Sequence, residues 1–64
     1  MEPHQQRVVD EANGLEDKLT KLSAFIESSP VFAGLDSMQQ DLLKAQAGAM
    51  SAYLQILKLR IASF

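Results

Sequence analysis

Cysteine is absent from these 64 residues, and histidine occurs once, at His4. Disulfides, thiolate zinc sites, iron–sulfur clusters and cysteine nucleophiles are therefore excluded. A single histidine also leaves too few partners for a triad or a typical metal site, because such sites need a base together with an orienting or ligating group. We expect no catalytic residue, no metal and no cofactor, and therefore a protein that binds or assembles rather than an enzyme.

Long apolar runs are also missing. No stretch approaches the roughly 18 consecutive apolar residues that cross a bilayer, and Met1–Gln5 lacks the character of a signal peptide. We expect one domain, residues 1–64, in the cytoplasm and without a membrane partner.

Six basic and eight acidic side chains give a net charge of −2. This balance disfavours duplex DNA as a partner of the whole surface.

The charges are unevenly distributed along the chain. Residues 1–41 carry three basic and eight acidic side chains, whereas residues 42–64 carry three basic side chains and no acid. A basic binding site is therefore predicted near the C-terminal end. The adjacent acids of the first half point about 100° apart on a helix and share no site, so we interpret them as a solvated face.

Apolar residues at alternating spacings of four and three predict a first helix that begins near Pro3 or His4. The pattern keeps its phase through Asn13 and Gly14, so we expect one continuous, weakened helix there. Ser28–Pro30 ends it, because a residue that precedes proline leaves the helical region. The stripe consists of Val8, Ala12, Leu15, Leu19, Leu22 and Ile26.

A second helix is predicted from Asp36 or Ser37, either of which can cap it, to Phe64. Between the helices lies a short apolar corner whose Val31, Phe32 and Leu35 are expected to fold back over the end. The fold class is therefore all-α: a hairpin of two long antiparallel helices with a short apolar corner.

The second helix has two apolar stripes, and one neighbouring helix covers only one of them. The first is Leu43, Ala47, Met50, Leu54, Leu57, Ile61 and Phe64; the second is Leu42, Ala45, Ala49, Ala52, Ile56, Leu59 and Ser63. An exposed apolar face of this length is typical of an interface. We therefore predict a compact, obligate homo-oligomer of hairpins.

Four positions are candidates for ligand binding on chemical grounds. His4 and Arg7 lie one turn apart and can together address an anionic or planar ligand. Arg60 and Ser63 lie three residues apart, and oligomerisation would bring several copies of Arg60 together around an anion such as a phosphate, which a guanidinium binds with two parallel hydrogen bonds. Some of these residues also have a structural explanation: Arg60, like Lys58, is a cation near a helix C-terminus and favours the dipole in any protein, and a lone histidine near a terminus such as His4 is often a solvated side chain.

Four segments together resemble a family of small phage proteins. They are Pro3–Val9 with Glu11, Lys18–Ile26, Pro30–Phe32 and Met50–Ile61. The family is that of the anti-CBASS sponge proteins, which sequester the cyclic oligonucleotide messengers of bacterial antiphage signalling. The resemblance covers nearly the whole chain and implies helical homohexamers that bind these messengers without cleaving them in the host bacterial cytoplasm.

The resemblance also implies two kinds of pocket. Cyclic trinucleotides such as cyclic tri-adenylate would bind near threefold axes through Arg60, with Ser63 as the nearest hydroxyl. Cyclic dinucleotides such as cyclic GMP-AMP would bind between paired protomers, where His4 stands in place of the family's aromatic residue. Lys18 or Lys21 would meet the phosphate there, and Arg7 shares the face of His4.

Three other classes of function compete with this interpretation. A structural oligomerisation or scaffold protein of a phage would use the same helices without a small-molecule ligand. A nucleic-acid-binding regulator is disfavoured because no helix is rich in arginine, lysine and asparagine. An enzyme is the least supported, because no nucleophile, base and oxyanion donor can be assembled from these residues.

Overall fold

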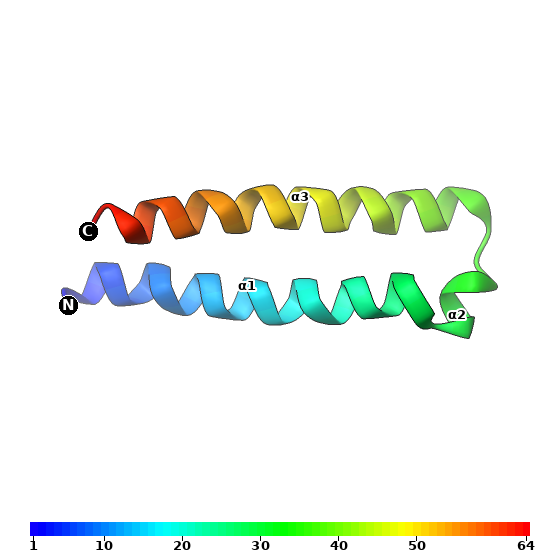
Figure 1. Cartoon of the computed structure of the whole chain (residues 1–64), viewed down its shortest axis with the longest axis horizontal. Helices are drawn as coiled ribbons and strands as arrows, with labels where there is room; N and C mark the ends of the chain where they lie inside the picture. Colours follow the sequence, from blue (N-terminus) through cyan, green and yellow to red (C-terminus); the bar gives the residue numbers. More distant parts are fainter.

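The chain folds as a hairpin of two long helices. A computed structural model describes residues 1–64, with α1 at Pro3–Ser28, α2 at Pro30–Ala33 and α3 at Ser37–Ala62. The two long helices run antiparallel, so both termini lie at one end and α2 lies at the other (Figure 1). We call these the open end and the closed end. The predicted all-α hairpin is confirmed.

Helix α1 begins where proline can occupy the first turn, because its missing N–H would have had no partner there. The backbone N–H of Glu2, the residue before the helix, donates to Oε1 of Gln5 at 2.9 Å, and this bond stabilises the start of the helix. The helix continues unbroken through Asn13 and Gly14, as the uninterrupted apolar phase predicted. The predicted stripe is buried or half-buried over its whole length, from Val8 to Ile26.

The corner contains one helical turn, α2, which the sequence analysis treated as an irregular connection. Ser29 caps this turn by accepting from the N–H of Val31 at 3.1 Å. Phe32 is buried and packs edge-to-face on Phe25, with ring centroids 5.9 Å apart. Leu35 is half-buried, but the prediction for Val31 is wrong: its side chain is 65% exposed, because the α2 turn directs Phe32 inward in its place.

Helix α3 begins at a side-chain cap. Asp36 accepts from the backbone N–H of Gln39 at 2.8 Å, which confirms one of the two predicted caps. Ser37, the other predicted cap, is the first residue of the helix, and the Gln40 amide donates to the carbonyl of Phe32 at 3.0 Å. The helix ends at Ala62, so Phe64 lies beyond it and is exposed rather than part of the inner stripe.

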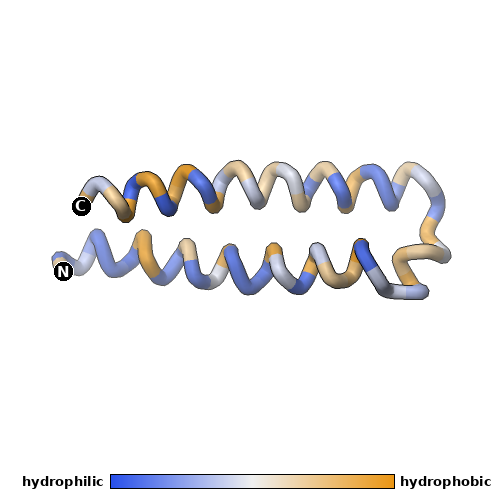
Figure 2. Tube along the Cα trace, viewed as in Figure 1, coloured by the Kyte–Doolittle hydropathy of each residue, from blue (hydrophilic) through white to orange (hydrophobic).

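The core is a thin layer between α1 and α3. Leu57 is the only fully buried large side chain, at 0% exposure. Val8, Ala12 and Leu54 are buried around it, and Leu15, Leu19 and Ile61 pack against this cluster. Figure 2 shows isolated hydrophobic turns on an otherwise hydrophilic α1, and a concentration of hydrophobic turns in α3 toward the C-terminus.

The hairpin is extended and exposes more surface than its mass requires. It measures 46 × 15 × 13 Å, and its radius of gyration is 14.5 Å. A compact chain of this length would have a radius of gyration of about 11 Å. Its accessible surface is 4635 Å², against about 4,100 Å² expected from the mass of a folded monomer. Neither long helix of this isolated hairpin is covered on its outer side.

Candidate ligand-binding residues

Four cationic side chains lack an acidic partner within the chain. The two ion pairs are Lys21 with Asp17, at 3.0 Å, and Lys58 with Glu16, at 3.4 Å. The first joins two residues four apart on the surface of α1. The cations left without an acidic partner are Arg7, Lys18, Lys44 and Arg60. All four are exposed, so each is accessible to an anion from solution.

His4 and Arg7 lie in the first turns of α1 at the open end, and both are exposed. Their separation by three residues places them on neighbouring positions of one helix face. The structure therefore brings together the imidazole and the guanidinium that the sequence paired. Nearby, Gln6 donates to Asp10 at 2.9 Å, so that acid is already engaged by a neutral side chain.

Lys18 and Lys21 lie further along α1, in its middle turns, and both are exposed. Lys18 is 14 residues after His4, which corresponds to about 21 Å along a helix axis. A small ligand that contacts His4 and Arg7 does not reach these lysines on the same chain. The predicted dinucleotide residues therefore form one pocket only if a second chain contributes some of them.

Arg60 and Ser63 lie at the open end, in the last turn of α3 and at its C-cap. The Ser63 hydroxyl donates to the backbone carbonyl of Arg60 at 2.7 Å. This bond satisfies one of the carbonyls that every helix leaves without a partner at its C-terminus. The donor of Ser63 is thus occupied within the chain, whereas the guanidinium of Arg60 is exposed and has no acidic partner.

The predicted basic residues near the two chain termini lie at the same end of the fold. They are His4 and Arg7 at the start of α1 and Arg60 at the end of α3. Figure 1 places the start of α1 and the end of α3 side by side at the open end. His4 and Arg7, in the first turns of α1, and Arg60, in the last turn of α3, therefore lie at the same end of the hairpin, although the family resemblance assigned them to two separate pockets. The single hairpin encloses no pocket around them, so any enclosed site needs further chains.

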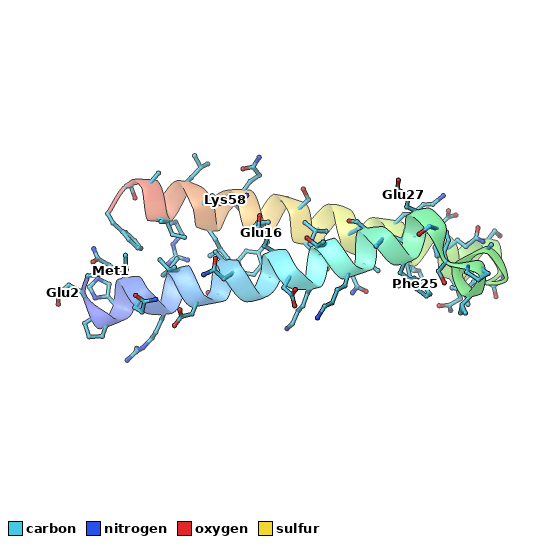
Figure 3. All side chains as sticks on the ribbon, turned by 60° about the horizontal axis from the view of Figure 1, so that its bottom comes forward. Met1, Glu2, Glu16, Phe25, Glu27 and Lys58 are labelled. Carbon is cyan, nitrogen blue, oxygen red and sulfur yellow. The ribbon has the colours of Figure 1, made fainter.

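Lys58 was a candidate cation near the helix end, and the structure gives it a different role. Its Nζ lies 3.4 Å from Oε1 of Glu16 in α1, midway along the hairpin (Figure 3). Position 20, one turn after Glu16, is a threonine and offers no cation, so the pair depends on the packing of the two helices. The facing stripes carry the signal for it: Leu15 and Leu57 belong to one apolar layer, and the residues that follow them, Glu16 and Lys58, meet beside that layer.

No group of three or more acidic or histidine side chains is arranged to hold a metal ion. No helix of the chain is both long enough and apolar enough to cross a membrane.

The fold and these residues define a small helical-hairpin protein with unpaired cations at its open end. The chain belongs to the Sequestin family, whose pattern matches residues 2–63. It is also 38% identical over 61 residues to an uncharacterized 7.5 kDa protein encoded in the denB-rIIB intergenic region of Enterobacteria phage T4. That match covers 95% of this chain and 94% of the phage protein. No solved structure matches.

The family match agrees with the resemblance to phage sequestering proteins that the sequence motifs indicated. It spans both long helices and the corner, so it concerns the whole hairpin and not one motif. The name of the family is consistent with a protein that sequesters a ligand, and the T4 relative is a phage protein of similar length.

Proposed function

We propose that this protein is a phage anti-defence protein that binds cyclic oligonucleotide second messengers and sequesters them without cleavage, which blocks CBASS immunity in the host cytoplasm. The observation that carries the proposal is Arg60, an exposed guanidinium without an acidic partner in a hairpin of the Sequestin family. A chain with net charge −2 repels phosphates at long range, so a locally unpaired cation is what such a ligand requires.

In the proposed trinucleotide site, copies of Arg60 from several chains surround one ligand such as cyclic tri-adenylate. Each guanidinium offers a fork of N–H donors that matches the two free oxygens of a phosphodiester. Ser63 stands beside it, and its hydroxyl oxygen retains acceptor capacity while its proton is bound to the Arg60 carbonyl. The assembly would be a homo-oligomer, which we propose to be a hexamer.

In the proposed dinucleotide site, His4 and Arg7 of one chain meet Lys18 or Lys21 of another around a ligand such as cyclic GMP-AMP. Lys18 is the better-placed of the two lysines, because Lys21 is already paired with Asp17 at 3.0 Å. The separation of the two groups along α1 supports a site shared between chains. The imidazole of His4 would lie against a base, and the cations would contact phosphates.

Sequestration works by mass action and needs no chemical step. Free messenger stays below the threshold of its receptor while protein sites are in excess and the affinity is high. Each tenfold gain in affinity corresponds to about 1.4 kcal/mol. Several sites in one oligomer would let a 64-residue chain remove several messengers.

The test compares two single substitutions that remove the same charge from α3. Arg60→Ala removes the proposed phosphate ligand, and Lys44→Ala removes an exposed cation that also lacks an acidic partner but lies far from the open end. Isothermal titration with cyclic tri-adenylate should show tight binding for the natural chain and Lys44→Ala, and a loss of at least tenfold for Arg60→Ala. Native mass spectrometry should show an unchanged oligomer and an intact ligand.

Equal binding by both variants would remove Arg60 from the site. No binding of any cyclic di- or trinucleotide by the natural oligomer would contradict the proposed function. The extensive uncovered face of α3 would then favour the second candidate, a phage scaffold protein that assembles through its helices and has no small-molecule ligand. Release of a cleaved nucleotide would instead indicate an enzyme.

A further inference from the structure

The outer side of α3 carries a complete second seam of apolar and small residues, which we call the outer seam. Its members recur at alternating spacings of four and three, the pattern of helices that pack in coiled coils. Every member is exposed in the single hairpin, and Met38 and Leu59 are 69% and 70% exposed. The outer seam comprises Met38, Leu42, Ala45, Ala49, Ala52, Ile56, Leu59 and Ser63.

The inner side of α3 already has its own seam, which packs on α1. Leu54 and Leu57 belong to that inner seam and are buried. Corresponding members of the two seams lie one or two residues apart, which places them about 100–200° apart around the helix. One helix can therefore pack with α1 on one side and with a second helix on the other. The chain itself supplies no helix for the outer seam.

The charges of α3 favour a second copy of the same helix in the opposite direction. Asp36 caps the first turn and Asp41 follows in the second, whereas Arg60, which has no acidic partner in the chain, lies in the last turn. Antiparallel packing of two α3 helices places the acidic end of each on the basic end of the other. Parallel packing would place acid against acid and base against base, with the helix dipoles also aligned unfavourably.

The number of seam residues that find a partner then selects one register. In an antiparallel pair related by a two-fold axis, a residue from one edge of the seam packs against a residue from the other edge. Pairing Ala49 with Ala52 also pairs Ala45 with Ile56 and Leu42 with Leu59, and leaves Met38 opposite Ser63. All eight residues of the outer seam then have a partner. A shift by one heptad leaves two of them unpaired.

Gly48 is a second and independent sign of a close neighbour. It lies in the middle of α3, where glycine costs about 1 kcal/mol relative to alanine. A Cβ atom at Gly48 would meet nothing within 4 Å in the single hairpin, so nothing in that hairpin requires glycine there. Its neighbour along the chain is Ala49, at the centre of the outer seam. A partner helix that approaches closely at this point would account for it.

We propose that two copies of this protein pair through their outer seams, with α3 antiparallel to α3 and the two-fold axis between Ala49 and Ala52. The proposal specifies an interface of the homo-oligomer in the proposed function, and it requires no ligand. A stable interface buries about 800 Å² on each partner, which is about a sixth of the 4635 Å² that one hairpin exposes. A seam that spans most of α3 is long enough to supply it.

Cysteine cross-linking tests both the direction and the register, because the natural chain contains no cysteine. Leu42→Cys and Leu59→Cys are prepared separately, and both sites are exposed, so neither should disturb the hairpin. The two positions lie about 26 Å apart along α3, whereas a disulfide needs Cα atoms within about 7 Å. The variants are oxidised alone and as an equal mixture, without nucleotide, and covalent dimers are measured on non-reducing gels.

An antiparallel pair in this register should give covalent dimers in the mixture and only background levels with either variant alone. Dimers from each variant alone would indicate a parallel pair and overturn the proposal. Ser51→Cys is the matched control, since residue 51 lies within about 1.5 Å of the level of its own copy in either direction but is off the seam, and it should not cross-link. A monomer by sedimentation, or an oligomer in which the mixture does not cross-link, would also overturn the interface. None of these results depends on nucleotide binding, so the proposed function is tested separately.

Discussion

Glu16 and Lys58 are 42 residues apart in the sequence, yet Oε1 of the first lies 3.4 Å from Nζ of the second. The pair joins the middle of α1 to the C-terminal half of α3. It also removes Lys58 from the cations that are free to bind an anion, so Arg60 is the unpaired cation near the end of α3.

The Glu16–Lys58 pair is predicted to contribute little to stability. The two side chains are 54% and 53% exposed, and exposed ion pairs contribute about 0.2–1 kcal/mol. A double-mutant cycle with Glu16→Gln and Lys58→Met, measured by chemical denaturation, should give a coupling energy in this range that decreases as salt is added. The same cycle on Asp17 and Lys21 is the control. A coupling well above this range, unaffected by salt, would contradict the exposed geometry.

Leu57→Ala is predicted to destabilise the hairpin strongly. Leu57 is 0% exposed, and truncation of a buried leucine to alanine costs about 2–5 kcal/mol. Thermal unfolding followed by circular dichroism should show a large drop in melting temperature. Leu59→Ala removes the same atoms from a side chain that is 70% exposed. It should leave the hairpin folded and weaken association, which sedimentation measures. Equal losses of helix for both variants would contradict the two separate seams.

Asp36→Ala is predicted to destabilise the start of α3. The carboxylate of Asp36 accepts from the N–H of Gln39 at 2.8 Å, and loss of such a cap costs about 1 kcal/mol. Asp36→Asn should retain most of the stability, because asparagine caps equally well. Asp41→Ala serves as the control for the loss of a negative charge without the cap. If Asp41→Ala lowered the stability as much as Asp36→Ala does, the loss would come from the removed charge and not from the cap.

Gly14→Ala is predicted to stabilise the protein by up to about 1 kcal/mol, the difference in helix propensity. Gly14 lies inside α1, and a Cβ there would meet nothing within 4 Å. Gly48→Ala is the informative comparison, since it has the same open surroundings in one hairpin but adjoins the outer seam. The midpoint of urea unfolding should rise more for Gly14→Ala. An equal rise of the unfolding midpoint in the two variants would contradict the inference that Gly48 permits the close approach of a partner helix.

The fold could be predicted closely because local rules determine each of its parts. Pro3 and Pro30 mark the boundaries of α1, and Asp36 caps α3. The continuous phase of the apolar stripe correctly outweighed the low helix propensity of Gly14. The direction of Val31 was mispredicted, because three apolar residues in a row do not show which one a single helical turn will bury.

The candidate site was less predictable, because it depends on which surfaces meet. The spacing of three residues predicted that His4 and Arg7 share one helix face, and both lie in the first turns of α1 as expected. The predicted antiparallel hairpin already placed Arg60 at the same end as His4 and Arg7, but it did not show which of these side chains share a site. It also missed the bond from Ser63 to the Arg60 carbonyl. The assignments of His4, Arg7, Lys18, Lys21, Arg60 and Ser63 to ligands remain predictions.

The amide of Gln40 bears on how the chains can assemble. It donates to the carbonyls of Phe32 and Ala33, at 3.0 and 3.4 Å, and so ties the start of α3 to the α2 turn. Domain swapping, in which α3 leaves its own α1 and packs on that of another chain, would require the corner to straighten. Straightening would break these bonds and expose Phe32, which is buried against Phe25. The corner therefore favours closed hairpins as the building blocks of any assembly, and new copies can join without an exchange of helices.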